Sequence, residues 1–158
     1  MYKQKHTFQQ GSWPERDNKA DKSSIPCPTQ PYHADGSVPN PSKRTVFVFG
    51  SNLAGIHGAG AAAAARKLFA APMGFSSGRC GRAYAIPTKD ADLHVLPLST
   101  IQLHVRRFVE YTHTQPDLEF FVTRVGCVLA GYSDSDIAPM FLGAANCSFP
   151  LPWAKYLP

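Results

Sequence analysis

The stretch VFVFGSNLAGIHGAGAAAAA, residues 46–65, decides how the rest of the chain is interpreted. Its first four residues are an apolar run of β-branched and aromatic side chains, which predicts a buried strand. Its alanine block predicts a helix that starts at Gly58 or Ala59 and ends at Phe69 or Ala70. The order strand, glycine loop, helix is typical of a phosphate-binding turn, because a helix start exposes unpaired backbone N–H groups.

The spacing of the loop glycines argues against the two commonest nucleotide-binding motifs. Gly55, Gly58 and Gly60 read G-x-x-G-x-G, whereas the dinucleotide fingerprint reads G-x-G-x-x-G. The loop also lacks the G-K-[ST] ending of a P-loop. Tight packing of the helix on the sheet is an alternative explanation of these glycines. Asn52 has two explanations of equal weight, a hydrogen bond to a ribose hydroxyl or a bond to its own turn.

The middle of the chain continues the alternation of strands and helices. Residues 74–82 predict a loop, and Ala83–Ile86 predict a short buried strand that the following proline ends. Ser99 and Gln102 predict a capping box at the start of a helix that ends before Pro116. Its apolar face is predicted from residues at helical spacing, which are Ile101, Val105, Phe108, Val109 and Thr112.

The C-terminal third predicts two more strands and a short helix. Residues 119–125 favour a strand, and residues 126–132 form a second loop at a strand end. Ser133 or Asp134 is expected to cap the short helix that follows, and residues 146–149 favour a last strand.

Strands and helices in alternation predict a three-layer α/β fold, with a mainly parallel or mixed sheet and helices on both faces. The Pro-rich tail with Trp153 is expected to lie over the surface. Residues 1–42 contain many prolines and polar residues and no period of 2 or 3.6, so they predict a disordered or loosely draped basic arm. A single domain is expected over residues 43–158.

Composition narrows the cellular setting and the partners. The formal net charge is +5. Residues 1–44 hold seven Lys or Arg against four acids, which is +3 and leaves +2 for the rest. The body is therefore expected to be close to neutral, and nucleic-acid binding is the weaker expectation. The four cysteines form no C-x-x-C pair and the histidines have no ligand spacing, so neither a metal site nor a cofactor is expected. The sequence contains no apolar signal core and no run of ~20 apolar residues, and its cysteines are interpreted as reduced thiols. These features predict a cytoplasmic protein without membrane contact.

Three motifs resemble those of macrodomains, the α/β modules that bind ADP-ribose. They are HGAGAA at 57–62, YAIPTK at 84–89 and TRVGCVL at 123–129, in the matching order. The nearest branch includes the terminal ADP-ribose protein-glutamate hydrolase and short macro-like proteins of phages and bacteria. The resemblance covers about residues 44–150 and implies a macro-like fold that binds ADP-ribose or an ADP-ribosylated macromolecule.

The resemblance also implies where the ligand binds. The loop of residues 51–60 would cradle one side of ADP-ribose, and the loop of residues 126–132 would close over the diphosphate and the distal ribose. The ligand-binding residues expected on this basis are Ser51, Asn52, Gly55, Gly58, Ala59, Gly60, Gly126, Cys127, Val128, Leu129, Ala130, Gly131 and Tyr132.

Lys89 is the residue expected to perform chemistry. In the hydrolase that the chain resembles, a lysine at this position attacks the anomeric carbon of the distal ribose, and an aspartate of the later loop is the acid/base. Here the G-C-G-L-D of that loop reads GCVLA, so Val128 replaces a glycine and Ala130 replaces the aspartate. Valine disfavours positive φ, so another loop shape is expected. A surface lysine that attracts a phosphate is the alternative for Lys89.

The loss of this aspartate favours a protein that binds ADP-ribose, or a slow ADP-ribosyl hydrolase, over an efficient enzyme. A general acid/base contributes a factor of about 10²–10⁴ to the rate. Asp90, Asp134 and Asp136 are the acids available as substitutes, although the last two are also explained as helix caps. Cys127 is interpreted as a small apolar residue rather than a nucleophile. The alternative function, from another class, is a non-catalytic interaction or regulatory module with a vestigial pocket.

Overall fold

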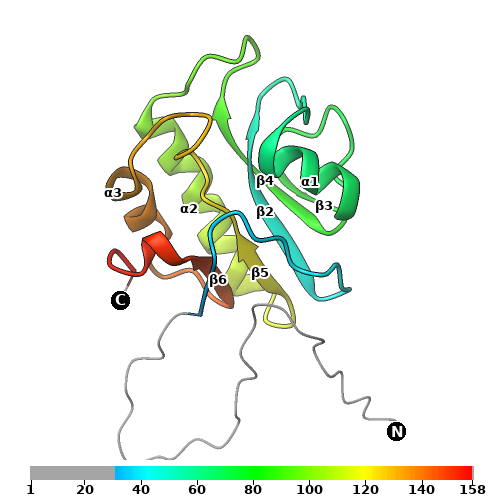
Figure 1. Ribbon diagram of the computed structural model, residues 1–158, viewed down its shortest axis with the longest axis vertical. Helices are drawn as coiled ribbons and strands as arrows, with labels where there is room; N and C mark the ends of the chain where they lie inside the picture. Colours follow the sequence, from blue (N-terminus) through cyan, green and yellow to red (C-terminus); the bar gives the residue numbers. More distant parts are fainter. Residues whose placement is uncertain (1–30, 158) are drawn as a thin grey trace, which may run out of the picture.

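The computed structural model describes residues 31–157 and contains one six-stranded sheet (Figure 1). The strands lie in the order β1-β6-β5-β2-β4-β3, and all neighbours are parallel except β3, which is antiparallel to β4. Their bounds are β1 Tyr32–His33, β2 Thr45–Asn52, β3 Gly78–Cys80, β4 Ala83–Lys89, β5 Glu119–Val122 and β6 Cys147–Pro150. The predicted mixed, mainly parallel sheet of an α/β protein is confirmed.

Helices cover both faces of the sheet, as predicted (Figure 1). Because successive side chains of a strand point to opposite faces, β2 contributes Phe47 and Phe49 to one core and Val46 and Val48 to the other. The first core packs under α1 (Gly60–Leu68), and the second packs under α2 (Leu98–Thr114). The second core also receives α3 (Asp134–Ile137) and two 3₁₀ helices, η1 (Ala138–Phe141) and η2 (Leu151–Trp153).

The capping prediction is wrong for α2 and right for α3. The helix α2 begins at Leu98 after Pro97, and no side chain caps it. Its buried face, Ile101, Val105, Phe108 and Thr112, has the predicted helical spacing. Packing of that face explains why a helix of 17 residues needs no cap. At α3, Ser133 accepts from the backbone of Asp136 and forms a capping box.

Two predictions around β4 are wrong. Residues 78–80 within the predicted loop form the edge strand β3, and Pro87 does not end β4, which continues to Lys89. Since β3 pairs only with residues 83–85, Pro87 has no ladder partner on that side and its missing N–H costs nothing there.

The tail prediction is also wrong, because Trp153 is fully buried. Its ring packs against Phe141 and Phe149, and its Nε1 donates a hydrogen bond of 2.8 Å to Asp134 Oδ1. The indole fills the core under the last strand, and this apolar burial outweighs the Pro-rich pattern of the surrounding sequence.

Structure begins earlier than the predicted domain start at residue 43. Tyr32 and His33 form β1, which pairs with β6, and His33 Nδ1 lies 2.7 Å from Ser148 Oγ. A two-residue strand is too short to show any alternation in the sequence. The rest of the predicted arm, residues 1–30, lies outside the described residues. No helix in the described part is long and apolar enough to cross a membrane.

Candidate functional site

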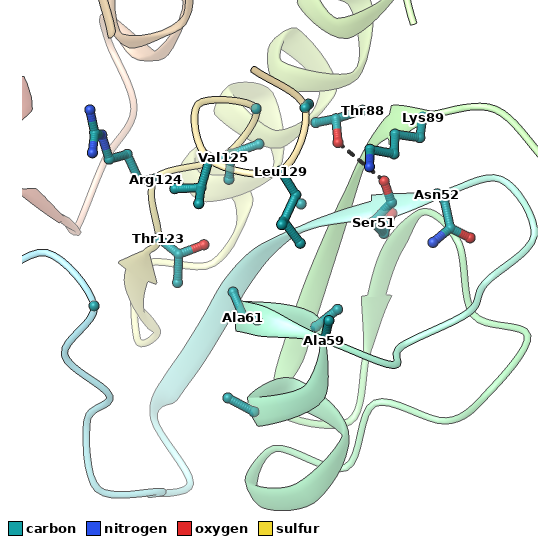
Figure 2. Close-up of a pocket in the computed structure, with 18 of the residues that line it drawn as sticks. Ser51, Asn52, Ala59, Ala61, Thr88, Lys89, Thr123, Arg124, Val125 and Leu129 are labelled. Carbon is teal, nitrogen blue, oxygen red and sulfur yellow. Dashed lines mark hydrogen bonds between the residues drawn. The ribbon is translucent and has the colours of Figure 1, made fainter. Parts of the chain in front are cut away.

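A pocket of about 540 Å³ opens at the carboxyl ends of β2, β4 and β5. Figure 2 shows Lys89 of β4 at one end of this pocket and Arg124, which follows β5, at the other. Ala59 and Ala61, at the start of α1, lie between them. Segments that are distant in the sequence therefore meet at one edge of the sheet, where open α/β folds bind their ligands.

The segment of residues 51–60, from the end of β2 to the start of α1, contributes five of the predicted residues to this lining: Ser51, Asn52, Gly58, Ala59 and Gly60. The hydroxyl of Ser51 donates to the backbone carbonyl of Ser76. The amide of Asn52 donates to the carbonyl of Ile56 at 2.8 Å and accepts from its N–H at 3.0 Å, so the local alternative for Asn52 is the one observed. Both polar side chains thus hold the loop in shape.

Gly55 is a packing glycine and does not line the pocket. Its φ is +68°, and a Cβ built on it would lie 2.4 Å from the carbonyl carbon of Gly74. This contact, with the bond from Gly74 N to Gly55 O, closes the loop onto the segment after α1. For this one glycine the packing explanation is the observed one.

The start of α1 exposes its backbone to the pocket. Its N-cap, Ala59, provides no side-chain hydrogen bond, and no acid lies in the first turn. The first N–H groups of the helix therefore have neither an intrahelical acceptor nor a cap. The lining side chains Ala61 and Ala62 are small, so a ligand can approach this backbone closely. The arrangement favours an anion at this position.

The loop after β5 forms the opposite wall. Four of its predicted residues line the pocket, namely Gly126, Val128, Leu129 and Ala130. Its left-handed positions are Gly126 and Gly131, with φ of +76° and +80°, whereas Val128 has no positive φ. The loop therefore accommodates Val128 without a left-handed conformation at that residue. Val128 and Leu129 are each 65% exposed at the mouth of the pocket.

Three predicted residues of this loop, Cys127, Gly131 and Tyr132, do not line the pocket. The hydroxyl of Tyr132 donates to Leu96 O at 2.7 Å and ties the loop to the segment before α2. Cys127 is half-buried, and burial raises the pKa of its thiol to about 12, with a further contribution from the charge of Asp134. The thiol is therefore protonated at neutral pH, as the apolar interpretation of Cys127 requires.

Lys89 ends β4, lines the pocket and is half-buried. It lies opposite Asn52 at an irregularity in the register of β2 and β4. Its ammonium group has no ion-pair partner among residues 31–157. None of the acids that the sequence offers as substitutes for the acid/base lines the pocket. They serve other roles: Asp90 holds its own turn, Asp134 pairs with Arg124, and Asp136 completes the capping box of α3 by accepting from the N–H of Ser133.

Two lining residues that sequence reasoning missed are Asp35 and Arg124. Their side chains form an ion pair of 3.1 Å, and Asp35 is the one carboxylate among the described lining residues. Asp35 follows β1 inside the predicted arm, where no periodicity marks it. Arg124 lies within the third motif of the resemblance, but an isolated arginine carries no signal of what it pairs with.

One cluster in the described part has the geometry of a metal site. Ligand atoms of Asp90, Asp92 and His94 lie within 4.8 Å of one another. Oδ1 of Asp90 already accepts from the N–H groups of Asp92 and His94, each at 2.9 Å. The turn that these bonds stabilise explains the cluster without an ion.

No family model, curated protein or solved structure matches the chain. The macrodomain resemblance thus rests on the three sequence motifs. In the fold, segments of all three motifs border a single pocket.

Proposed function

We propose that this chain binds ADP-ribose or a related nucleotide in the pocket at the carboxyl ends of β2, β4 and β5. The observation that carries the proposal is that the two expected binding loops line one cavity, together with the uncapped start of α1. A volume of about 540 Å³ lies within the range of cofactor and small-ligand sites.

The distribution of charge in the pocket supports a ligand with a central diphosphate. The start of α1 supplies free N–H groups and the positive end of the helix dipole, and Lys89 adds a cation at one end. At the other end, the carboxylate of Asp35 is an acceptor for an amino group such as that of adenine. A nucleotide that spans these three positions offers phosphates to the helix start and Lys89, and a hydrogen-bond donor to Asp35.

The residues around Lys89 favour binding over efficient catalysis. Attack by the amine requires it to be deprotonated, and the reaction requires an acid to serve the leaving group. Ala130 provides no such group, and the carboxylate of Asp35 is paired with Arg124. A slow ADP-ribosyl hydrolase activity through Lys89 is the catalytic extension of the proposal.

Calorimetric titration of the full chain with ADP-ribose, with AMP and NAD as controls, tests the proposal. We expect micromolar binding that is selective for ADP-ribose and is lost in Gly60→Val, because valine disfavours the φ of +56° that Gly60 adopts at the start of α1. Gly143→Val is the matched control, since Gly143 has a φ of +86° and does not line the pocket. Absence of binding to all three nucleotides would favour the interaction module with a vestigial pocket.

A further inference from the structure

The near-neutral body of the protein consists of two halves with opposite charge. Residues 36–89 contain seven Lys or Arg and no Asp or Glu, whereas residues 90–158 contain four Lys or Arg and seven acids. The net charges of these segments are +7 and −3. The seven cations are Lys43, Arg44, Arg66, Lys67, Arg79, Arg82 and Lys89. The net charge of the body alone hides this separation.

Four of these cations and Arg107 of α2 flank the open edge of the sheet, and we call these five residues the basic edge. The strand β3 is the last in the sheet order and lies beside α1 (Figure 1). Arg79 belongs to β3, Arg82 follows it, and Arg66 and Lys67 lie in the last turn of α1.

Hydrogen bonds connect the parts of the basic edge. Arg82 N donates to Phe69 O at 3.1 Å, and Arg82 Nη2 donates to Leu68 O at 3.4 Å, which places Arg82 at the end of α1. Arg79 Nη1 donates to the hydroxyl of Tyr111 at 3.0 Å, and Tyr111 is one helical turn beyond Arg107 on α2. The five cations therefore belong to one region that spans both sides of β3.

None of these five cations forms an ion pair with a carboxylate in the part of the chain that the structure describes. Of the other three described arginines, Arg44 pairs with Glu119 and Arg124 pairs with Asp35 and Asp134, whereas Arg106 of α2 forms no ion pair within the described residues. Uncompensated like charges that lie close together repel one another and raise the local potential. A polyanionic partner would supply the missing counter-charge.

We propose that the basic edge binds the phosphate backbone of a nucleic acid. Four of its five cations are arginines, whose planar guanidinium group binds phosphate with two parallel hydrogen bonds. A nucleic acid is a line of regularly spaced phosphates, and the five cations are spread over α1, α2, the edge strand β3 and the turn after it, so they can contact more than one phosphate. The surface lies at the C-terminal end of α1, whereas the pocket lies at its N-terminal end, so both sites are accessible at the same time.

Fluorescence anisotropy of the full chain with labelled single strands of DNA and RNA of about 20 nucleotides tests this proposal. The test variant is Arg66→Gln with Lys67→Gln, because both side chains are exposed and we expect their replacement to preserve the fold. We expect about tenfold weaker binding and a salt dependence, as the slope of log K against log salt, that is smaller by about 1 to 2. Arg79→Gln should weaken binding in the same way.

Lys155→Glu is the matched control, since it also lowers the net charge from +5 to +3 and is exposed near the C-terminus. We expect it to bind nucleic acid as the unaltered chain does. An equal loss in this control, no effect of the double variant, or no binding of either single strand would overturn the proposal. Vesicles of phosphatidylcholine with phosphatidylserine are the second probe, and stronger binding to them through Arg66 and Lys67 would overturn it in favour of a lipid surface. None of these outcomes depends on the ligand of the pocket.

Discussion

Arg124 and Asp134 form a two-point ion pair, in which Nε and Nη2 of the arginine donate to the two carboxylate oxygens at 2.7 Å each. The pair is the centre of a longer chain of contacts. Arg124 Nη1 also reaches Asp35, at 3.1 Å, and Asp134 Oδ1 also accepts from Trp153 Nε1. The wall of the pocket is thereby joined to the C-terminal core, and the segment after β1 is anchored beside it.

We expect Asp134→Asn to lower the free energy of unfolding by about 2 kcal/mol, because an amide cannot accept both charge-assisted bonds from Arg124. Urea denaturation measures the change. Asp117→Asn is the control, since Asp117 is exposed and forms no side-chain ion pair within the described part, and it should shift the value by less than about 0.5 kcal/mol. Equal stability of the two variants would show that the ion pair contributes nothing.

The same ion pair predicts a pH dependence of stability. Hydrogen bonds from Arg124 hold the pKa of Asp134 below its ordinary value of 3.8 in the folded state. The stabilisation is therefore fully present above about pH 4, and it is lost as the pH falls through the lowered pKa. The difference in melting temperature between the unaltered chain and Asp134→Asn should be constant near neutral pH and shrink in acid. A difference that grows in acid would contradict the assignment.

Gly55 and Gly58 belong to the same loop but should respond differently to alanine. Gly55→Ala places a Cβ 2.4 Å from the backbone of Gly74 at a φ of +68°, so we expect a loss of several kcal/mol in unfolding free energy. Gly58 has no atom within 4 Å of a built Cβ and no positive φ, so Gly58→Ala should leave stability nearly unchanged. Thermal melts of the two variants make the comparison. A stable Gly55→Ala variant would mean that the loop is not packed on Gly74.

Sequence patterns predicted those parts of the fold in which local preference and burial agree. The VFVF run became β2, and four of the five residues predicted for the apolar face of α2 are buried, while Val109 is partly buried. A long apolar period leaves few ways to pack a helix on a sheet. Trp153 was predicted to lie on the surface because its surroundings are rich in proline. In the fold, burial of this one large apolar side chain determines the position of the segment. The strands β1 and β3, of two and three residues, are defined only by the partners β6 and β4.

For the candidate site, the sequence predicted which loops meet but not which atoms face the cavity. Lys89 and most of the loop residues line the pocket because they follow strand ends that parallel pairing brings together. Asp35 was missed because its position depends on a long-range ion pair with Arg124. The turn geometry of a loop decides which of its residues face the pocket, and the sequence pattern does not show that geometry. Gly55 and Tyr132 were therefore predicted to contact the ligand, whereas they pack against the protein.

Ala130→Asp tests whether Lys89 retains a catalytic position. Ala130 lines the same pocket as Lys89, and an aspartate there would supply the acid/base that the loop lacks. We expect release of ADP-ribose from an ADP-ribosyl ester of glutamate to accelerate by about 10²-fold, and Lys89→Met in the same variant to remove the gain. Ala91→Asp adds the same charge at an exposed position outside the pocket and should have no effect. A gain that survives Lys89→Met would mean that the aspartate activates water directly, and no gain in Ala130→Asp would leave binding as the role of the pocket.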